Sequence, residues 1–328
     1  MPELHVRPFG PSDLATVVAL WNRCLPKDTI TEERFWQLFL LDANFDRAGA
    51  LVAEAGAEPG AGGKIVGFIC VIARRFPLGT IGLEPEKGYM TAFFVDPAWR
   101  RRGVGTALLS TGAAWLRGRG CRELWCNGYA PYYVTPGVDL DYGEAHAFLR
   151  LNGFAEAGAA VAMGRPLEGA RMPTWVRETA RRLAEDDGIE VRMFRREDTL
   201  PLLELVEREF PGWAPPVLDG LQHGNLEIVV AVRGDGGGEG EVLGCTQWEN
   251  TYNDPPRGVA GRFGPFGVRP DLRNRGLGAV IFWTMVERAV ARGSRYLWFG
   301  WAGGRNVAFY ERMGCRVTRH FVLYRKEL

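Results

Sequence analysis

The sequence predicts an α/β protein made of two similar domains in tandem. The chain has 328 residues, which is enough for two domains of ordinary size. Its 46% apolar and 12% aromatic residues can fill two cores. A long internal repeat, together with strand and helix patterns that follow the same order in both halves, indicates that one domain is a copy of the other.

Two segments repeat one another at a distance of 173 positions (268 − 95). The first reads VDPAWRRRGVG from Val95, and the second reads VRPDLRNRGLG from Val268. The same distance separates Leu124-Trp125 from Leu297-Trp298 in the strands that follow. Each copy therefore predicts a strand, a turn with proline, a basic glycine-rich loop and a helix.

The other elements are also expected twice. A first strand (5–9 and 190–194) precedes an acidic residue placed to cap a helix, Asp13 or Asp198. Pairs of strands around a glycine-rich turn are expected at 50–54 and 65–73, and at 227–232 and 242–248. The helices after the basic loops carry apolar or small residues at helical spacing, which predicts packing against a sheet: Leu109, Gly112, Ala113 and Leu116, then Phe282, Met285, Val286 and Ala289.

A charged segment separates the two halves. Residues 174–184 predict a helix that ends at Gly188, and their Arg and Glu content indicates a solvated face. We expect this helix to bridge the domains. The predicted organisation is an N-terminal domain over 1–168, a linker over 169–188 and a C-terminal domain over 189–328.

The basic loops suit an anion. Their glycines let the backbone approach a ligand closely, and the first N–H groups of the next helix have no partner within the helix. Arginines at the rim favour phosphate. A dinucleotide fingerprint is excluded because its third glycine is replaced by Leu108 or Ile281, and no Gly-Lys-Ser/Thr of a Walker loop is present. The alternative is that such a loop only caps the helix that follows it. The occurrence of the same loop in both halves makes this alternative less favoured than an anion site.

The pattern Arg-x-x-Gly-x-Gly after a strand ending in Val-x-Pro resembles the coenzyme A loop of GNAT-family N-acyltransferases. It occurs as RRRGVG (100–105) and RNRGLG (273–278). The resemblance covers almost the whole chain and implies an α/β (α+β) fold of two tandem GNAT-like domains, each a twisted mixed β-sheet flanked by helices. The tandem arrangement is similar to that of mycothiol synthases, although nothing in the sequence identifies their substrate.

The resemblance implies that the loop amides hold the pyrophosphate of acetyl-CoA. The cofactor-binding residues implied in the first half are Phe94, Val95, Arg100, Arg101, Arg102, Gly103, Val104, Gly105 and Thr106. Those implied in the second half are Phe266, Gly267, Val268, Arg273, Asn274, Arg275, Gly276, Leu277, Gly278, Ala279 and Asn306.

The halves differ in the helix after the next strand. Residues 306–315 (NVAFYERMGC) resemble the late helix of the family, in which a tyrosine matching Tyr310 lies near the CoA sulfur. The first half has Leu149 in place of Tyr310, and Ala145 in place of Asn306. Because a tyrosine hydroxyl can protonate a departing thiolate and a leucine cannot, we expect the C-terminal half to be catalytic, with Tyr310 as the acid.

Other parts of the catalytic site stay open at this stage. The oxyanion donor is expected to be a backbone N–H near Gly267 or Val268. The base is not evident: Glu249, Asp254, Glu227 and His223 are candidates that suit a surface or loop better, and a water is an alternative. His5, His146 and His320 are expected to be structural.

An insertion distinguishes the first half. It spans 127–144, is rich in tyrosine and proline, and has no counterpart of equal length in the second half. Such a loop can shape a substrate pocket or cover a cleft between the domains, and it can also simply pack against the partner domain.

Composition narrows the function. The net charge of +1 (40 − 39) argues against nucleic acid and membrane partners. Six scattered cysteines without a Cys-x-x-Cys pair fit a reducing compartment and no metal site. No signal peptide or membrane span is evident, so a cytoplasmic protein is expected.

We therefore predict an acetyl-CoA-dependent N-acyltransferase that acts on a small-molecule or peptide amine. Two alternatives remain: a non-catalytic acyl-CoA sensor or scaffold, and catalysis by the N-terminal half through a tyrosine of the insertion.

Overall fold

The computed structural model describes residues 4–56, 63–126, 128–130, 132–224, 226–234, 240–254 and 258–328. Most of the two expected glycine-rich turns, 56–63 and 234–240, lies outside these ranges, as do Asn127 and Pro131 of the insertion. Within the described residues, no helix is both long and apolar enough to cross a membrane.

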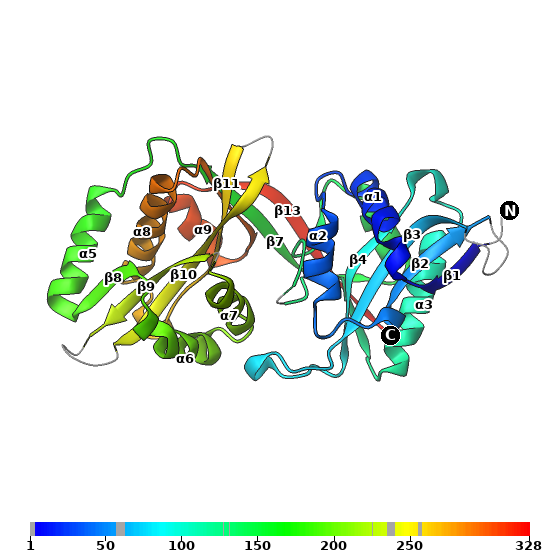
Figure 1. Ribbon diagram of the computed structural model, residues 1–328, viewed down its shortest axis with the longest axis horizontal. Coiled ribbons are helices and arrows are strands. Elements are labelled where there is room, and N and C mark those ends of the chain that lie inside the picture. Colours follow the sequence, from blue (N-terminus) through cyan, green and yellow to red (C-terminus); the bar gives the residue numbers. More distant parts are fainter. Residues whose placement is uncertain are drawn as a thin grey trace. The chain divides into compact units, whose positions relative to one another are not determined.

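The chain divides into two compact units (Figure 1). The first comprises Met1–Pro77, Gly82–Ala160 and His320–Leu328, and the second comprises Leu78–Ile81 and Val161–Arg319. The expected domains, 1–168 and 189–328, are contiguous and differ from these units. Residues 161–168 and the expected linker 169–188 belong to the second unit, and residues 320–328 belong to the first.

The first unit contains a mixed sheet in the order β1-β2-β3-β4-β5-β13. Neighbouring strands are antiparallel except for the parallel pair β4 and β5, and the short β6 pairs with β13. The elements are β1 (Leu4–Pro8), α1 (Leu14–Cys24), α2 (Glu32–Phe35), β2 (Ala50–Ala55), β3 (Lys64–Ala73), β4 (Lys87–Val95), α3 (Val104–Gly118), β5 (Glu123–Cys126), β6 (Val138–Asp139), α4 (Gly143–Leu151) and β7 (Ala155–Pro166).

The second unit repeats this plan in the order β7-β12-β11-β10-β9-β8, with β11 and β12 parallel. Its elements are α5 (Thr174–Asp187), β8 (Ile189–Met193), α6 (Thr199–Glu209), α7 (Ala214–His223), β9 (Leu226–Arg233), β10 (Glu241–Asp254), β11 (Gly258–Val268), α8 (Leu277–Ala291), β12 (Tyr296–Ala302), α9 (Arg305–Arg312) and β13 (Arg316–Glu327). The predicted α/β class, with a mixed sheet flanked by helices in each half, is confirmed.

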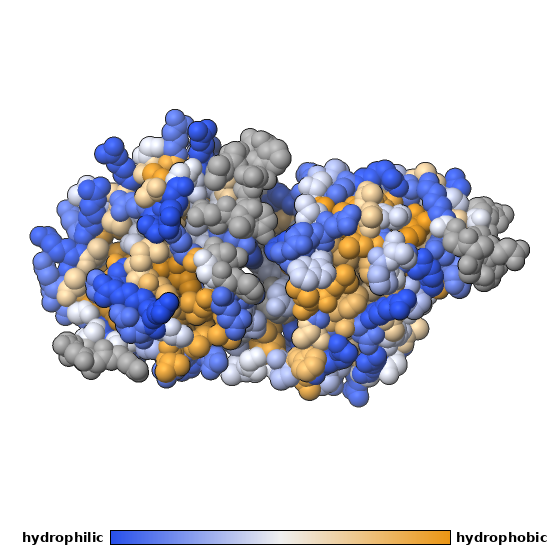
Figure 2. Space-filling model, viewed as in Figure 1, coloured by the Kyte–Doolittle hydropathy of each residue, from blue (hydrophilic) through white to orange (hydrophobic). Residues whose placement is uncertain are grey.

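Each sheet has a core on both faces. In the first unit, α1 and α2 cover one face with Trp21 and Phe35, and α3 covers the other with Leu108 and Leu116. In the second unit, α6 and α7 cover one face, and α8 covers the other together with α5. Every residue of the two predicted helical stripes is buried. Figure 2 shows that polar side chains cover much of the visible surface between apolar patches.

The helix α5 is not a free bridge between domains. It packs against α8 and β8, and its Val176 and Leu183 are fully buried in the core of the second unit. The charged residues of its sequence predicted a solvated face correctly, but the two apolar residues on the opposite face fix the helix to one unit.

The strands β7 and β13 each contribute to both units. Residues 155–160 of β7 and 320–327 of β13 lie in the first unit, while residues 161–166 and 316–319 lie in the second. In the first unit, Tyr324 of β13 pairs with Cys126 of β5, and its hydroxyl lies 2.8 Å from Nδ1 of the buried His146. The last residues of the sequence therefore complete the sheet of the first unit.

Replacing Tyr324 by alanine is expected to destabilise the first unit. The side chain is fully buried, and truncating a large buried aromatic residue costs about 3–5 kcal/mol. Chemical denaturation of the variant would measure the loss. His320→Ala, which truncates an exposed side chain of the same strand, is the control. Equal stability of the two variants would show that the end of β13 does not contribute to this core.

Asp13 and Asp198 stand at the N-cap positions of α1 and α6, but their side chains accept no hydrogen bond from these helices and instead make the same other contacts in each half. Asp13 accepts hydrogen bonds from Arg7 Nη1 and the Gly10 amide, both at 2.7 Å. Asp198 accepts them from Arg192 Nη1 at 2.6 Å and the Arg195 amide at 2.7 Å. Burial alone would raise the pKa of both carboxyls, but these hydrogen bonds lower it on balance.

Asp13→Asn is expected to destabilise the protein at neutral pH and less so in acid. A lowered carboxyl pKa stabilises the fold above the unfolded value of about 4, and this contribution disappears as the pH falls through the folded value. The difference in free energy of unfolding between variant and wild type should therefore be smaller at about pH 3 than at about pH 7, as measured by urea denaturation. Glu156→Gln, which alters an exposed ion pair, is the control. A difference in free energy of unfolding that is independent of pH would contradict the lowered pKa of Asp13.

Candidate functional site

The two basic loops have the same backbone geometry. In the first, β4 ends at Val95, a short 3-10 turn follows at Pro97–Trp99, and α3 begins after Gly103. Gly103 and its counterpart Gly276 have φ angles of 82° and 88°, in the left-handed region that favours glycine. Arg101 and Asn274 also have positive φ angles, of 60° and 64°. Such turns direct successive amides toward one point, which suits an anion.

Next to each loop, two parallel strands separate. β4 pairs with β5 only over Lys87–Tyr89, and β11 pairs with β12 only over Ala260–Arg262. A register shift in the pairing of β4 with β3 also leaves Thr91 as an extra, bulged residue. In the described part of the chain, β4 therefore has no strand partner on the β5 side beyond Tyr89.

In the first unit, the gap between these strands is open. It forms a cavity of about 960 Å³ that extends from the basic loop along β4 to the end of α1. Seven of the nine residues predicted in this half line it: Phe94, Val95, Arg100, Arg101, Gly103, Gly105 and Thr106. The other two face elsewhere, since Arg102 lies over the Trp99 ring at 5.2 Å and Val104 is buried in the core.

The cavity carries opposite charges on its walls. Arg100 forms an ion pair with Glu144 and donates from Nε to the Val95 carbonyl at 3.3 Å. Away from the loop, Asp28 lies in the turn that follows α1, and Asp139, Asp141 and Tyr142 come from the insertion. The Tyr142 hydroxyl lies 3.1 Å from Asp28 Oδ2, and Lys27 forms an ion pair with Asp141.

The insertion thus lines the cavity of its own unit. Its residues Val134, Thr135, Gly137, Val138, Asp139, Asp141, Tyr142, Gly143 and Glu144 are all in the lining. Shaping a substrate pocket is one of the roles predicted for this insertion, and it stays a prediction.

In the second unit, aromatic side chains fill the equivalent gap. Phe263, Phe299 and Tyr310 stand where the first unit has Met90, Cys126 and Leu149, which all line the cavity. The ring centroids of Phe299 and Tyr310 are 4.3 Å apart, and the Phe263 ring lies 5.9 Å from Phe299. Tyr310 is buried, and burial raises the pKa of its hydroxyl.

Helix α5 lies against the second loop. A Cβ atom added to Gly276 would be 2.6 Å from Cγ2 of Thr179, whereas the same position at Gly103 has no atom within 4 Å. Arg275 forms an ion pair with Asp187 at 2.9 Å, and its carbonyl accepts a hydrogen bond from Arg182 Nη2 at 3.0 Å. An anion at this loop would therefore compete with the side chains of α5.

The other residues predicted in the second half are mostly packed. Phe266 stacks on Phe309 above Gly278, a Cβ at Gly267 would meet Phe210 at 2.5 Å, and Arg273 donates to the Val268 carbonyl at 3.2 Å. Val268, Leu277 and Ala279 are buried, and Asn306 is exposed.

The candidate bases lie in different surroundings. Glu227 forms ion pairs with Arg288 and Arg292, both at 2.7 Å. Glu249 is half-buried, and the side chains of Asp254 and His223 lie outside the described residues.

Sequence reasoning missed the residues at the end of α1 that line the cavity, namely Arg23, Cys24 and Asp28. No motif marks them. It also missed the exchange of Met90 and Cys126 for Phe263 and Phe299, although the 173-residue repeat places each pair in register.

The family model described as Acetyltransferase (GNAT) family matches residues 14–134 and 195–315. The chain belongs to this family. It is a GNAT-type N-acetyltransferase with two tandem GNAT domains, as predicted.

Two GNAT relatives with a described activity are aminoglycoside N(6')-acetyltransferases type 1. The protein of Stenotrophomonas maltophilia is 32% identical over 123 residues, which are 38% of this chain and 71% of the relative. That of Klebsiella aerogenes is 27% identical over 118 residues, which are 36% of this chain and 74% of the relative.

Solved GNAT structures share the whole fold. A glucosamine N-acetyltransferase region of a fungal multi-domain β-N-acetylglucosaminidase has a TM-score of 0.80 at 21% identity, over 99% of this chain and 38% of the longer one. A GNAT protein of Sphaerobacter thermophilus has a TM-score of 0.70 at 21% identity, over 99% and 95% of the two chains. A tandem GNAT protein of clavulanic acid biosynthesis has a TM-score of 0.68 at 16% identity, over 99% and 98%.

Cys126→Phe is expected to close the cavity of the first GNAT domain. The change introduces the aromatic residue that the second unit has at Phe299, and overpacking of the gap should weaken acetyl-CoA binding by at least about tenfold. Calorimetric titration of acetyl-CoA would measure it, with Cys126→Ser as the control of similar size. Unchanged binding by the phenylalanine variant would place the acetyl-CoA site elsewhere.

Proposed function

We propose that the protein transfers the acetyl group of acetyl-CoA to the amine of a small molecule, and that the first unit carries the reaction. The observation that supports this most is the cavity of about 960 Å³ that joins the first basic loop to the open edge of β4. The second unit has the same loop and the same separated strands, but aromatic residues and α5 occupy the corresponding space.

The residues of the first unit fit acetyl-CoA. The amides at the start of α3, together with Arg100 and Arg101, would hold the diphosphate. The main chain of β4 beyond Tyr89 would hydrogen-bond the extended arm of the cofactor, because it has no strand partner there in the described residues. An amide of this edge would also stabilise the oxyanion that forms on the thioester carbonyl.

The opposite wall fits an amine. Asp28, Asp139 and Asp141 line the same cavity, and carboxylates attract an ammonium group and can accept its proton. Lys27 offsets one of these three charges, because it pairs with Asp141 and lies 3.8 Å from Asp139. Of the insertion tyrosines, Tyr129 is fully buried in the core, whereas Tyr142 lines the cavity next to Asp28. We assign Tyr142 the protonation of the departing thiolate and Asp28 the uptake of the amine proton.

The relatives support a cationic, sugar-like acceptor. Two are named for acetylating aminoglycosides, and one similar structure is named for acetylating glucosamine. An amino sugar carries the positive charge that the acidic wall favours, so we propose this class of amine as the acceptor. The six free cysteines suit a reducing compartment, and we propose the cytoplasm as the location.

The sequence motif of 306–315 favours a second candidate, in which Tyr310 acts as the acid and the C-terminal unit is catalytic. Its acetyl-CoA site would require α5 to move from the second loop and the aromatic residues to separate. A non-catalytic sensor, in which both loops bind acetyl-CoA and neither unit reacts, is the remaining candidate.

Matched variants of the two loops test these assignments. Gly105→Glu is expected to abolish acetyl-CoA binding and turnover, because its Cβ would lie 3.1 Å from the Phe148 ring and its carboxylate would stand in the cavity beside the basic loop. Gly278→Glu, at the same place of the second loop, should leave both intact, since the first unit is unchanged. Calorimetry and acetylation assays with kanamycin and glucosamine would measure both. Activity that survives only in Gly105→Glu would assign catalysis to the C-terminal unit.

Tyr310→Phe separates the candidates further. The proposal expects turnover to stay within about twofold of wild type, whereas removal of an essential catalytic acid costs about 10²–10⁴-fold. Binding of acetyl-CoA by the wild type without transfer to any amine tested would support the sensor.

A further inference from the structure

A buried arginine contacts the start of the insertion whose later residues line the cavity. Arg74 follows β3, and its side chain is only 2% exposed. Burying a charge is costly unless the group is paired and hydrogen-bonded. The partners of Arg74 therefore indicate what this residue is for.

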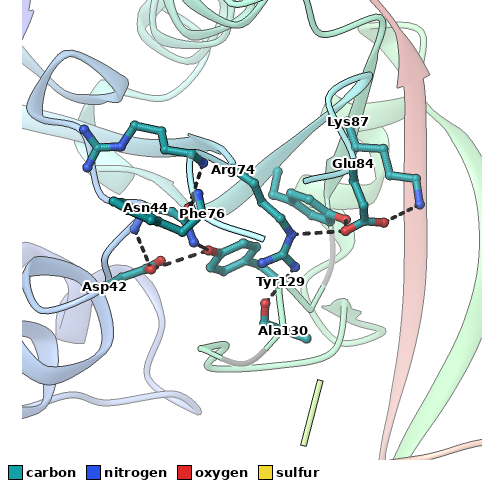
Figure 3. Close-up of polar contacts among 10 residues, drawn as sticks. Asp42, Asn44, Arg74, Phe76, Glu84, Lys87, Tyr129 and Ala130 are labelled. Atoms are coloured by element: carbon teal, nitrogen blue, oxygen red, sulfur yellow. Dashed lines mark hydrogen bonds and ion pairs between the residues drawn. The ribbon is translucent and has the colours of Figure 1, made fainter. Parts of the chain in front are cut away.

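Arg74 connects three segments of the first unit (Figure 3). Its Nε donates to Glu84 Oε2 at 3.1 Å, and its Nη2 donates to the Ala130 carbonyl at 2.7 Å. Its guanidinium also lies over the Tyr129 ring, 4.5 Å from the centroid. Because Tyr129 and Ala130 begin the insertion, one side chain holds this loop by both its backbone and its aromatic ring.

The Tyr129 side chain is fixed from its other end. Its hydroxyl accepts a hydrogen bond from Asn44 Nδ2 at 2.7 Å, and its ring is fully buried. Asn44 Oδ1 in turn accepts hydrogen bonds from the amides of Arg75 and Phe76, at 2.8 and 2.9 Å. The segment that carries Arg74 and the start of the insertion are therefore joined into one polar network.

The later part of the insertion is connected to this anchored start. The Gly128 amide donates to the Pro136 carbonyl at 2.8 Å, which ties the anchored start of the loop to its later part. Most residues of 134–142 then line the cavity, including Asp139, Asp141 and Tyr142 on its wall. In the second unit, where the gap is filled, only Gly303 and Gly304 connect β12 to α9.

The network is not arranged for stability alone. Among the described residues, Arg74 Nη1 and Asp42 Oδ2 are buried side-chain atoms of this region without a hydrogen-bond partner. Replacing a buried ionic group by apolar side chains is often neutral or stabilising, so stability by itself does not explain an incompletely satisfied arginine. A requirement for a fixed loop position explains it.

We infer that Arg74 is a positioning residue, which holds the insertion so that Asp139, Asp141 and Tyr142 face the acceptor amine. The inference rests on the proposed function, in which the first unit binds this amine. Arg74 itself does not line the cavity, and it acts through Tyr129 and Ala130.

Arg74→Met and Arg74→Lys test this role, with Arg7→Met as the matched control. Arg7 is also an ion-paired arginine of the first unit, bound to Asp13 and Glu54, but its bonds do not reach the insertion. Arg74→Met should raise the KM for kanamycin or glucosamine by about tenfold or more, because the acidic wall is no longer held in place. The Kd for acetyl-CoA should change by less than about threefold, since the basic loop keeps its geometry.

Amide hydrogen exchange provides a readout that does not depend on turnover. Exchange over 132–142 should be at least about tenfold faster in Arg74→Met than in wild type, and unchanged in Arg7→Met even if both variants lose similar stability. Arg74→Lys should fall between wild type and Arg74→Met, since lysine can pair with Glu84 but cannot present the fork that reaches Ala130.

The outcomes distinguish failure of the positioning role of Arg74 from failure of the proposed function. Equal exchange and equal KM values in Arg74→Met and Arg7→Met would overturn the positioning role. Failure of the wild type to acetylate either amine would overturn the proposed function instead, and the exchange rates would still decide whether Arg74 fixes the loop.

Discussion

The structure depends on the short length over which the central parallel strands of each unit are paired. β4 and β5 share three residue pairs and then separate, and β11 and β12 do the same. Buried backbone amides and carbonyls need hydrogen-bond partners, so the separated edge has to meet side chains, water or a ligand. In the first unit, the elements to which we assign a function lie around this gap: the basic loop at one end, α4 beside it and the insertion along its wall.

The two units resolve this constraint in opposite ways. Phe263, Phe299 and Tyr310 close the gap in the second unit, and α5 covers its loop. The smaller Met90, Cys126 and Leu149 leave the gap of the first unit open, and the insertion adds a polar wall. Large buried aromatic side chains contribute strongly to core stability, so the second copy gains packing at the place where the first has a cavity.

Local patterns in the sequence predicted the helices and the basic loops of both units. The helical stripes of α3 and α8 are buried, and both glycine loops have their left-handed residues, because spacing and backbone freedom act within a few residues. The contribution of β7 and β13 to both units, and the position of α5, could not be predicted in the same way. Thr179 meets Gly276, and Asp187 meets Arg275, across about ninety residues of sequence, and no local pattern encodes such contacts.

The prediction that the second unit is catalytic depends chiefly on Tyr310, and it stays a prediction. Tyr310 has the hydroxyl that the chemistry requires, and the sequence alone does not show that Phe299 lies 4.3 Å from its ring. Whether a tyrosine serves as an acid or as packing depends on its neighbours in space. A comparison of the two repeats by side-chain volume, as well as by motif, would have indicated which gap is open.

The course of β13 sets the order in which the molecule can be made. The sheet of the first unit includes residues 320–327 of β13, which leave the ribosome only after the entire second unit has been synthesised. Domains usually fold as they emerge, with the N-terminal one first, but here the earlier half has to wait for the later one. A nascent chain interrupted between the halves would therefore lack the strand that pairs with β5 and β6 in the first unit.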